Sequence, residues 1–132
     1  AKDIKESLAS DNTWTFYIGH SAKLKATDPY IGLWLKATNE LISKYEPVDT
    51  NNEIIGIFAC GAQDYAPDLV KEAGTIWYTE NLTNTGVGAV GLVKLAFSLS
   101  DGKDRGATRR EVQADMDNAA GNKISRITYV WW

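Results

Sequence analysis

Several segments of the chain arrange their apolar residues in the way that β-strands do. Residues 13–18 are apolar at every second position, which predicts a strand with one buried face. Residues 53–60 form a nearly continuous apolar run rich in isoleucine, which predicts a central strand buried on both faces. Similar patterns predict further strands over residues 22–26, 75–79, 92–100 and 123–132.

One segment has the apolar spacing of a long helix. Asp28 and Pro29 are typical of an N-cap and a first helical position. The apolar residues that follow recur three or four positions apart, as on one buried helix face. The pattern therefore predicts a main helix over residues 28–45.

A second main helix and a short N-terminal helix complete the predicted elements. Thr108 and Glu111 have the spacing of a capping box, and Gly121 is a typical residue at a helix end. Residues 3–10 resemble a short amphipathic helix. Together the elements predict an α+β fold with a single mixed or mostly antiparallel sheet of five to six strands. The 132 residues contain no repeat or linker, so we expect one domain over residues 1–132.

Charge and composition exclude some classes of partner. With 14 basic and 17 acidic residues the net charge is −3, so the chain lacks the basic excess of nucleic-acid-binding proteins. No apolar run approaches the roughly 20 residues that span a bilayer. A single cysteine favours the cytoplasm over secretion, whereas the sequon at Asn81 leaves glycosylation open.

The residues that could carry chemistry form no complete catalytic or metal-binding set. The only histidine, His20, lies in a Gly-His-Ser turn, and Cys60 ends a buried strand without a basic residue nearby. The glycine-rich residues 86–91 precede a segment that alternates like a strand, whereas a phosphate loop precedes a helix. We therefore predict no catalytic residue, metal or cofactor.

Tryptophan is several times more frequent than usual for this length, and such residues often anchor interfaces. The chain ends in Trp131 and Trp132, which predicts that this end docks into a sheet or against a partner. A pocket lined by Trp14, Trp34 and Trp77 is the alternative use of the aromatic residues.

A basic cluster lies around the start of the second predicted helix. Basic side chains near a helix N-terminus are mildly unfavourable, which favours a use in docking an acidic protein surface. The cluster consists of Lys103, Arg105, Arg109 and Arg110.

Short motifs resemble the actin-depolymerising-factor homology domain, in particular its coactosin-like members. Residues 11–14, 76–81 and 117–122 carry the likeness, together with the order of the predicted elements. The resemblance implies actin binding, with Lys71 at the position of a basic actin-contacting residue. The family's long helix between its fourth and fifth strands has no counterpart here, because residues 82–90 are too short and too rich in glycine.

We therefore expect a non-enzymatic protein-binding or self-assembling domain that uses exposed aromatic anchors, with actin as one specific partner and a homo-oligomer as another form. One alternative is a small-ligand carrier or enzyme that uses the tryptophan pocket with carboxylates such as Asp64 and Glu80. Another is a secreted effector, toxin or coat-type structural protein.

Overall fold

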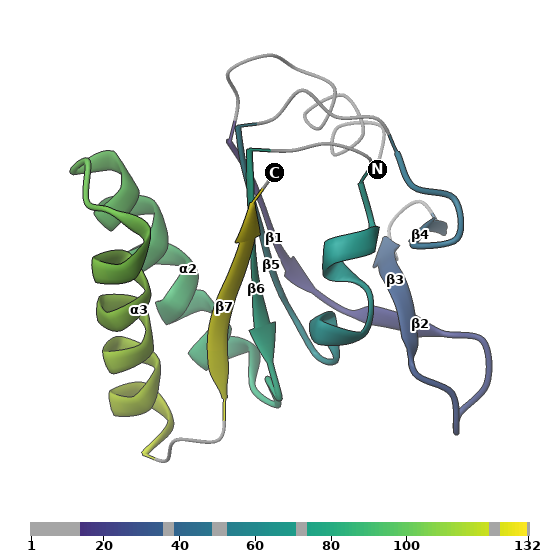
Figure 1. Ribbon diagram of the computed structural model, residues 1–132. Coiled ribbons are helices and arrows are strands. Elements are labelled where there is room, and N and C mark those ends of the chain that lie inside the picture. The colour runs from purple at the N-terminus through teal and green to yellow at the C-terminus, as the bar shows by residue number, and fades with distance from the viewer. Residues whose placement is uncertain (1–13, 36–38, 49–52, 71–73, 122–124, 132) are drawn as a thin grey trace.

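A four-stranded mixed sheet forms the middle of the molecule (Figure 1). The computed structural model describes residues 14–35, 39–48, 53–70, 74–121 and 125–131. Strands β1 (Trp14–Gly19), β5 (Ile54–Ala59), β6 (Thr75–Glu80) and β7 (Arg126–Trp131) lie in the order β1-β5-β6-β7. The first three are parallel to one another, and β7 runs antiparallel to β6.

The remaining elements lie in the connections between these strands. The chain between β1 and β5 forms a second, antiparallel sheet of β2 (Ser21–Lys23), β3 (Tyr30–Leu35) and β4 (Glu40–Ser43). Two short 3-10 helices, η1 (Ala62–Asp64) and η2 (Ala66–Asp68), connect β5 to β6. Two helices of 16 residues each, α2 (Thr85–Ser100) and α3 (Arg105–Ala120), connect β6 to β7.

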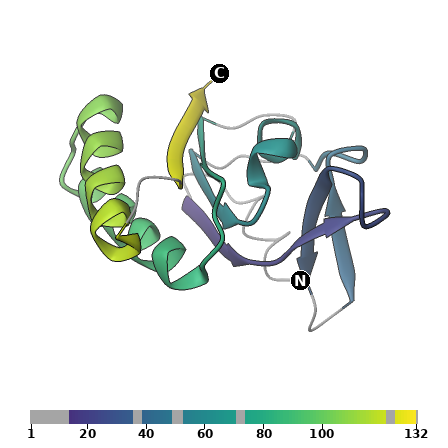
Figure 2. The ribbon, with the colours of Figure 1, turned by 90° about the horizontal axis from the view of Figure 1, so that it is seen from below.

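The four-stranded sheet has a hydrophobic core on each face. Helices α2 and α3 cover one face, and the 3-10 helices with the small sheet lie on the other (Figures 1 and 2). Alternate residues of β5 serve the two cores, with Ile55 and Ile57 on the side of the small sheet and Phe58 on the side of the helices. Trp77 and Ile76 of β6 divide in the same way, because neighbouring side chains of a strand point to opposite faces.

The predicted α+β class is confirmed, and so are the strands at β1, β5, β6 and β7. The prediction of a single sheet was wrong in detail, since the described strands form one mixed sheet and one separate antiparallel sheet. The short strand expected over residues 22–26 is found as β2, shifted towards the N-terminus. The N-terminal helix over residues 3–10 lies outside the described residues.

The helix predicted over residues 28–45 was wrong, because this segment forms β3 and β4. Asp28 lies in a turn, where its backbone N–H donates to the carbonyl of Lys25. A Cβ atom on Gly32 would lie 1.9 Å from the carbonyl oxygen of Ile42, so the close approach of the two strands leaves no room for a side chain here. The apolar run of β3 fits either periodicity, and its pairing with β2 and β4 decides for a strand.

The strand predicted over residues 92–100 was also wrong, because these residues form the second half of α2. Asn84 is the N-cap, and its side chain accepts a hydrogen bond from the backbone N–H of Gly86 at 2.7 Å. A helix therefore runs through the glycine-rich stretch, where we predicted none. A helix of 16 residues also occupies the place where residues 82–90 were judged too short for one.

Helix α3 was predicted, but its first residue was not. The N-cap is Asp104, which accepts from the backbone N–H of Ala107 at 2.8 Å, rather than Thr108 as the capping-box spacing indicated. Thr108 is buried inside the helix. The predicted end is confirmed, because Gly121 follows the helix with a φ of 69°, a left-handed conformation that glycine adopts without strain.

Candidate interaction surface

Helix α2 carries apolar side chains on both its buried and its exposed face. Its buried residues are Val87, Gly88, Gly91, Leu95 and Ser98. Its exposed residues include Val93 and Phe97, whose exposed fractions are 52% and 65%. A surface helix ordinarily buries its apolar stripe and exposes its polar face. The face of α2 that points away from the sheet therefore carries apolar side chains where a surface helix ordinarily carries polar ones.

No charged residue lies among the exposed positions of α2. We call this set of exposed residues the outer stripe; it consists of Thr85, Gly86, Ala89, Val90, Val93, Phe97 and Ser100. Lys94 is the single charged residue of the whole helix, and it is half-buried.

The neighbouring helix α3 provides an internal comparison. It has the same length and lies in the same layer, but it carries six charged residues, namely Arg105, Arg109, Arg110, Glu111, Asp115 and Asp117. Its buried residues, such as Val112 and Met116, are apolar. The chain thus builds one ordinary solvent-facing helix and one helix whose outer face is suited to contact with another apolar surface.

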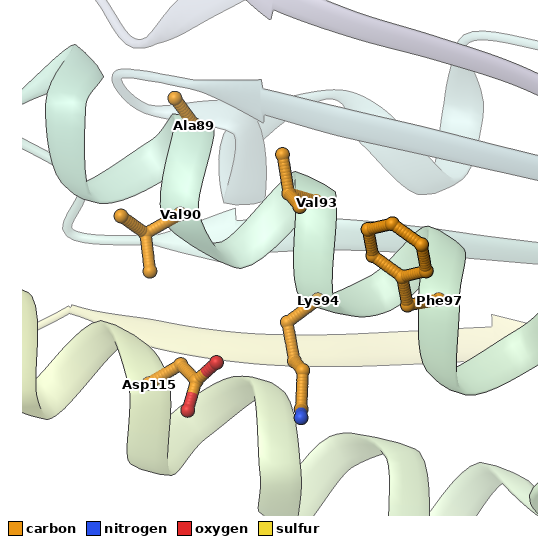
Figure 3. A pocket seen from close by; sticks show the side chains of 6 residues that line it. All are labelled: Ala89, Val90, Val93, Lys94, Phe97 and Asp115. Atoms are coloured by element: carbon orange, nitrogen blue, oxygen red, sulfur yellow. The ribbon is translucent and has the colours of Figure 1, made fainter.

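The outer stripe borders a shallow hollow of about 520 Å³ between the two helices (Figure 3). The side chains of Val90, Val93 and Phe97 stand along α2, with Ala89 at the same end as Val90. The charged lining comes from Lys94 and Asp115, which lie towards α3. The hollow is therefore apolar along α2, with one positive and one negative group at its side.

Close packing against α3 holds α2 in place. A Cβ atom on Gly91 would come within 2.7 Å of the Met116 sulfur, so glycine lets the two helices approach. Near the other end, the Ser98 hydroxyl donates to Glu111 Oε2 at 2.7 Å, and Lys103 forms an ion pair with the same carboxylate. The hydrogen bonds from Lys103 and from Ser98 lower the pKa of Glu111 below its ordinary value of 4.5.

The predicted aromatic anchors divide between the core and the surface. Trp77 is fully buried under the helices, whereas Trp131, at the end of β7, is 58% exposed. Tyr129 lies between them, with its ring centroid 4.6 Å from that of Trp77 and 5.5 Å from that of Trp131. The expected docking of the chain end into a sheet is observed for β7, and Trp132 lies outside the described residues.

The three tryptophans of the predicted pocket lie on different elements. Trp14 begins β1 and packs edge-on against Phe16, with centroids 6.3 Å apart, on the helix side of the four-stranded sheet. Trp34 belongs to β3 in the small sheet, and Trp77 is enclosed in the core beneath α2 and α3. None of them lines the hollow beside α2.

Three members of the basic cluster contact their own chain. Lys103 pairs with Glu111, as described above. Arg105 donates to Thr75 Oγ1 at 3.3 Å and places its guanidinium 5.0 Å from the ring centroid of Trp131. Arg109 donates to the carbonyl of Ile127 at 3.2 Å, whereas Arg110 is exposed on α3. The contacts of Arg105 and Arg109 hold α3 against the sheet, and docking of an acidic surface here stays a prediction.

The outer edge of β7 is covered by Gln113 of α3. The Gln113 amide nitrogen donates to the carbonyl of Ser125 at 2.8 Å, and its oxygen accepts from the backbone N–H of Ile127 at 3.0 Å. A neighbouring strand would pair with the same two groups through its own peptide bond. Gln113 therefore blocks this part of the sheet edge to a further strand.

On the face of the four-stranded sheet opposite α2 and α3, the side chains that could carry chemistry form structural contacts. Tyr65 is buried, its hydroxyl lies 2.6 Å from Ser21 Oγ, and burial raises its pKa. Asp64 Oδ2 accepts from the backbone N–H of Tyr30 at 3.0 Å. His20 is exposed, and the described residues contain no group of three potential metal ligands among His, Cys, Asp and Glu.

Comparisons of the chain with protein-family models, with curated proteins and with solved structures gave no match. Within the described part of the chain, no helix is long and apolar enough to cross a membrane.

The outer stripe was missed because residues 92–100 were interpreted as a strand. The signal was present in the sequence, since the 16 residues of α2 contain one charge and follow a good N-cap at Asn84. Lys71, which the resemblance pointed to, lies outside the described residues.

Proposed function

We propose that this protein is a non-enzymatic protein-binding domain, and that a partner docks on the outer stripe of α2. One observation carries the proposal: α2 exposes valine and phenylalanine and no charged residue, whereas the neighbouring helix α3 carries six charged residues. An aromatic ring such as that of Phe97, surrounded by other apolar side chains, is a common anchor of interfaces.

The size of the effect supports a role in binding. With 65% of Phe97 exposed, its ring offers about 130 Å² to a partner, and burial of that area contributes roughly 3 kcal/mol. The valines of the stripe add to this area. Lipid is the less favoured partner, since interfacial helices carry many basic residues on their polar flank and α2 has only Lys94.

Photo-crosslinking tests this function directly. A benzophenone amino acid is placed at position 97 in the full chain, and in a control chain it replaces Leu24, which is 67% exposed and lies away from α2. We expect one defined protein adduct from position 97, identified by mass spectrometry, that Val93→Asp abolishes. Equal labelling from the two positions, or none from position 97, contradicts the proposal.

Actin is a second candidate partner, on the basis of the sequence resemblance. In the family that the sequence resembles, the long helix between the fourth and fifth strands contributes to the actin contact, and α2 lies in the corresponding part of this chain. Co-sedimentation with actin filaments tests this partner, with Phe97→Asp and Lys71→Ala as the variants and Leu24→Asp as the control. Failure of the wild-type chain to pellet with filaments removes actin.

A further inference from the structure

We infer that the partner on the outer stripe is a second copy of this chain, docked with its α2 antiparallel to the first about a two-fold axis near Val93. This inference rests on the proposed function and specifies its partner. It follows from the order of side-chain sizes along the helix and from the charges beside the hollow.

The outer stripe has its smallest side chains near its N-terminal end and its one aromatic ring in its C-terminal half. Gly86 and Ala89 have little or no side chain, Val93 lies near the middle, and Phe97 is the largest member. An antiparallel copy centred on Val93 brings the Phe97 ring of each chain opposite Ala89 of the other. A parallel copy would instead place the two phenylalanine rings against each other. The reversed arrangement therefore pairs the largest side chain of the stripe with a small one, and it is compatible with a two-fold axis.

The charged groups beside the hollow agree with the same axis. Met116 packs against Gly91, and the two helices run antiparallel, so Asp115 lies at about the level of Lys94. A two-fold axis at this level brings the Lys94 of each copy within reach of the Asp115 of the other. Each group already has an oppositely charged neighbour beside the hollow of its own chain, and the second copy adds a further one across the interface.

The sheet edge at β7 is a less suitable route to self-association. Gln113 and Arg109 already occupy backbone groups of Ser125 and Ile127 that a second strand would need. We therefore place the contact between the two copies at the uncharged face of α2 and not at this part of the β7 edge.

Sedimentation velocity of the full chain over a micromolar to millimolar concentration series tests the association. We expect a dimer for the wild-type chain. Phe97→Asp should weaken association at least 100-fold, while Leu24→Asp, at a side chain of nearly equal exposure, should leave it unchanged. Because both positions are exposed, circular dichroism should show that both variants remain folded. A wild-type monomer at every concentration, or a dimer that Phe97→Asp leaves intact, overturns the inference.

Disulfide trapping tests the orientation. In a Cys60→Ala background, Val93→Cys should form a covalent dimer on oxidation, because the two positions face each other at the axis. Phe97→Cys should not, since an antiparallel pair separates the two positions by about 12 Å along the helix, beyond the ~7 Å limit for a disulfide. Efficient trapping through position 97 and not through position 93 overturns the antiparallel arrangement.

The two levels of the proposal can fail separately. If the chain is a monomer and position 97 crosslinks to a different protein, the binding function stands and the second copy is excluded. If position 97 crosslinks to residues 1–13 of its own chain, or if the monomer binds phosphatidylcholine vesicles through the stripe, both the second copy and the protein-binding role are overturned.

Discussion

Replacement of Gln113 by leucine should destabilise the protein by opening the covered edge of β7. The substitution keeps nearly the same volume but removes the amide that donates to Ser125 and accepts from Ile127. Each of these two hydrogen bonds contributes about 1 kcal/mol, and an unpaired N–H next to the buried Ile127 side chain costs a further 1–2 kcal/mol, roughly. We therefore expect the free energy of unfolding to fall by about 3–4 kcal/mol.

Urea denaturation followed by tryptophan fluorescence measures this change. A loss of this size lowers the midpoint by roughly 1–2 M when the slope of the transition is unchanged. Arg110→Ala is the control on the same helix, because Arg110 is exposed, and it should change stability by less than about 0.5 kcal/mol.

Hydrogen exchange separates this mechanism from a general loosening of the helix. In the Gln113→Leu variant the Ile127 amide should lose more protection than the Val130 amide, which faces β6 in the strand pairing. If Ile127 keeps its protection, or if the urea midpoint moves by less than about 0.3 M, the glutamine does not act as a substitute strand.

Two further predictions concern the packing of α2 on α3. The pKa of Glu111 is lowered by Lys103 and Ser98, so this carboxylate stabilises the fold above its ordinary pKa of 4.5 and loses that contribution as the pH falls through its folded value. In acid titrations of stability, Glu111→Gln should therefore show a shallower decline below that pH than the wild type, and an identical decline would refute the effect. Gly91→Leu should overpack Met116 and destabilise by about 1–3 kcal/mol in thermal melts, whereas Gly106→Ala, whose Cβ has 3.5 Å to its nearest neighbours, should not. A neutral Gly91→Leu would show that the helices can separate without cost.

Local sequence patterns were sufficient to predict the elements whose apolar spacing fits only a helix or only a strand. The apolar run that forms β5 is short, rich in isoleucine and buried on both faces, and this pattern favours a central strand. Gly121 ends α3 in a left-handed conformation, which is unfavourable for most residues other than glycine. Such signals depend only on the residue and its near neighbours. They can therefore be recognised in the sequence without the tertiary structure.

The segments that became β3 and α2 have apolar residues that satisfy both a helical and a strand pattern, so only contacts with distant residues could decide between them. At Gly32 the backbone approaches Ile42 too closely for a side chain, and at Gly91 the helix approaches Met116 in the same way. The outer stripe depends on that second decision. Sequence determined that α2 would hold almost no charge, but the contact with Met116 and Phe58 determined which of its faces was left outside. Burial is a property of the whole fold, and for that reason the apolar face of α2 could be located only in three dimensions.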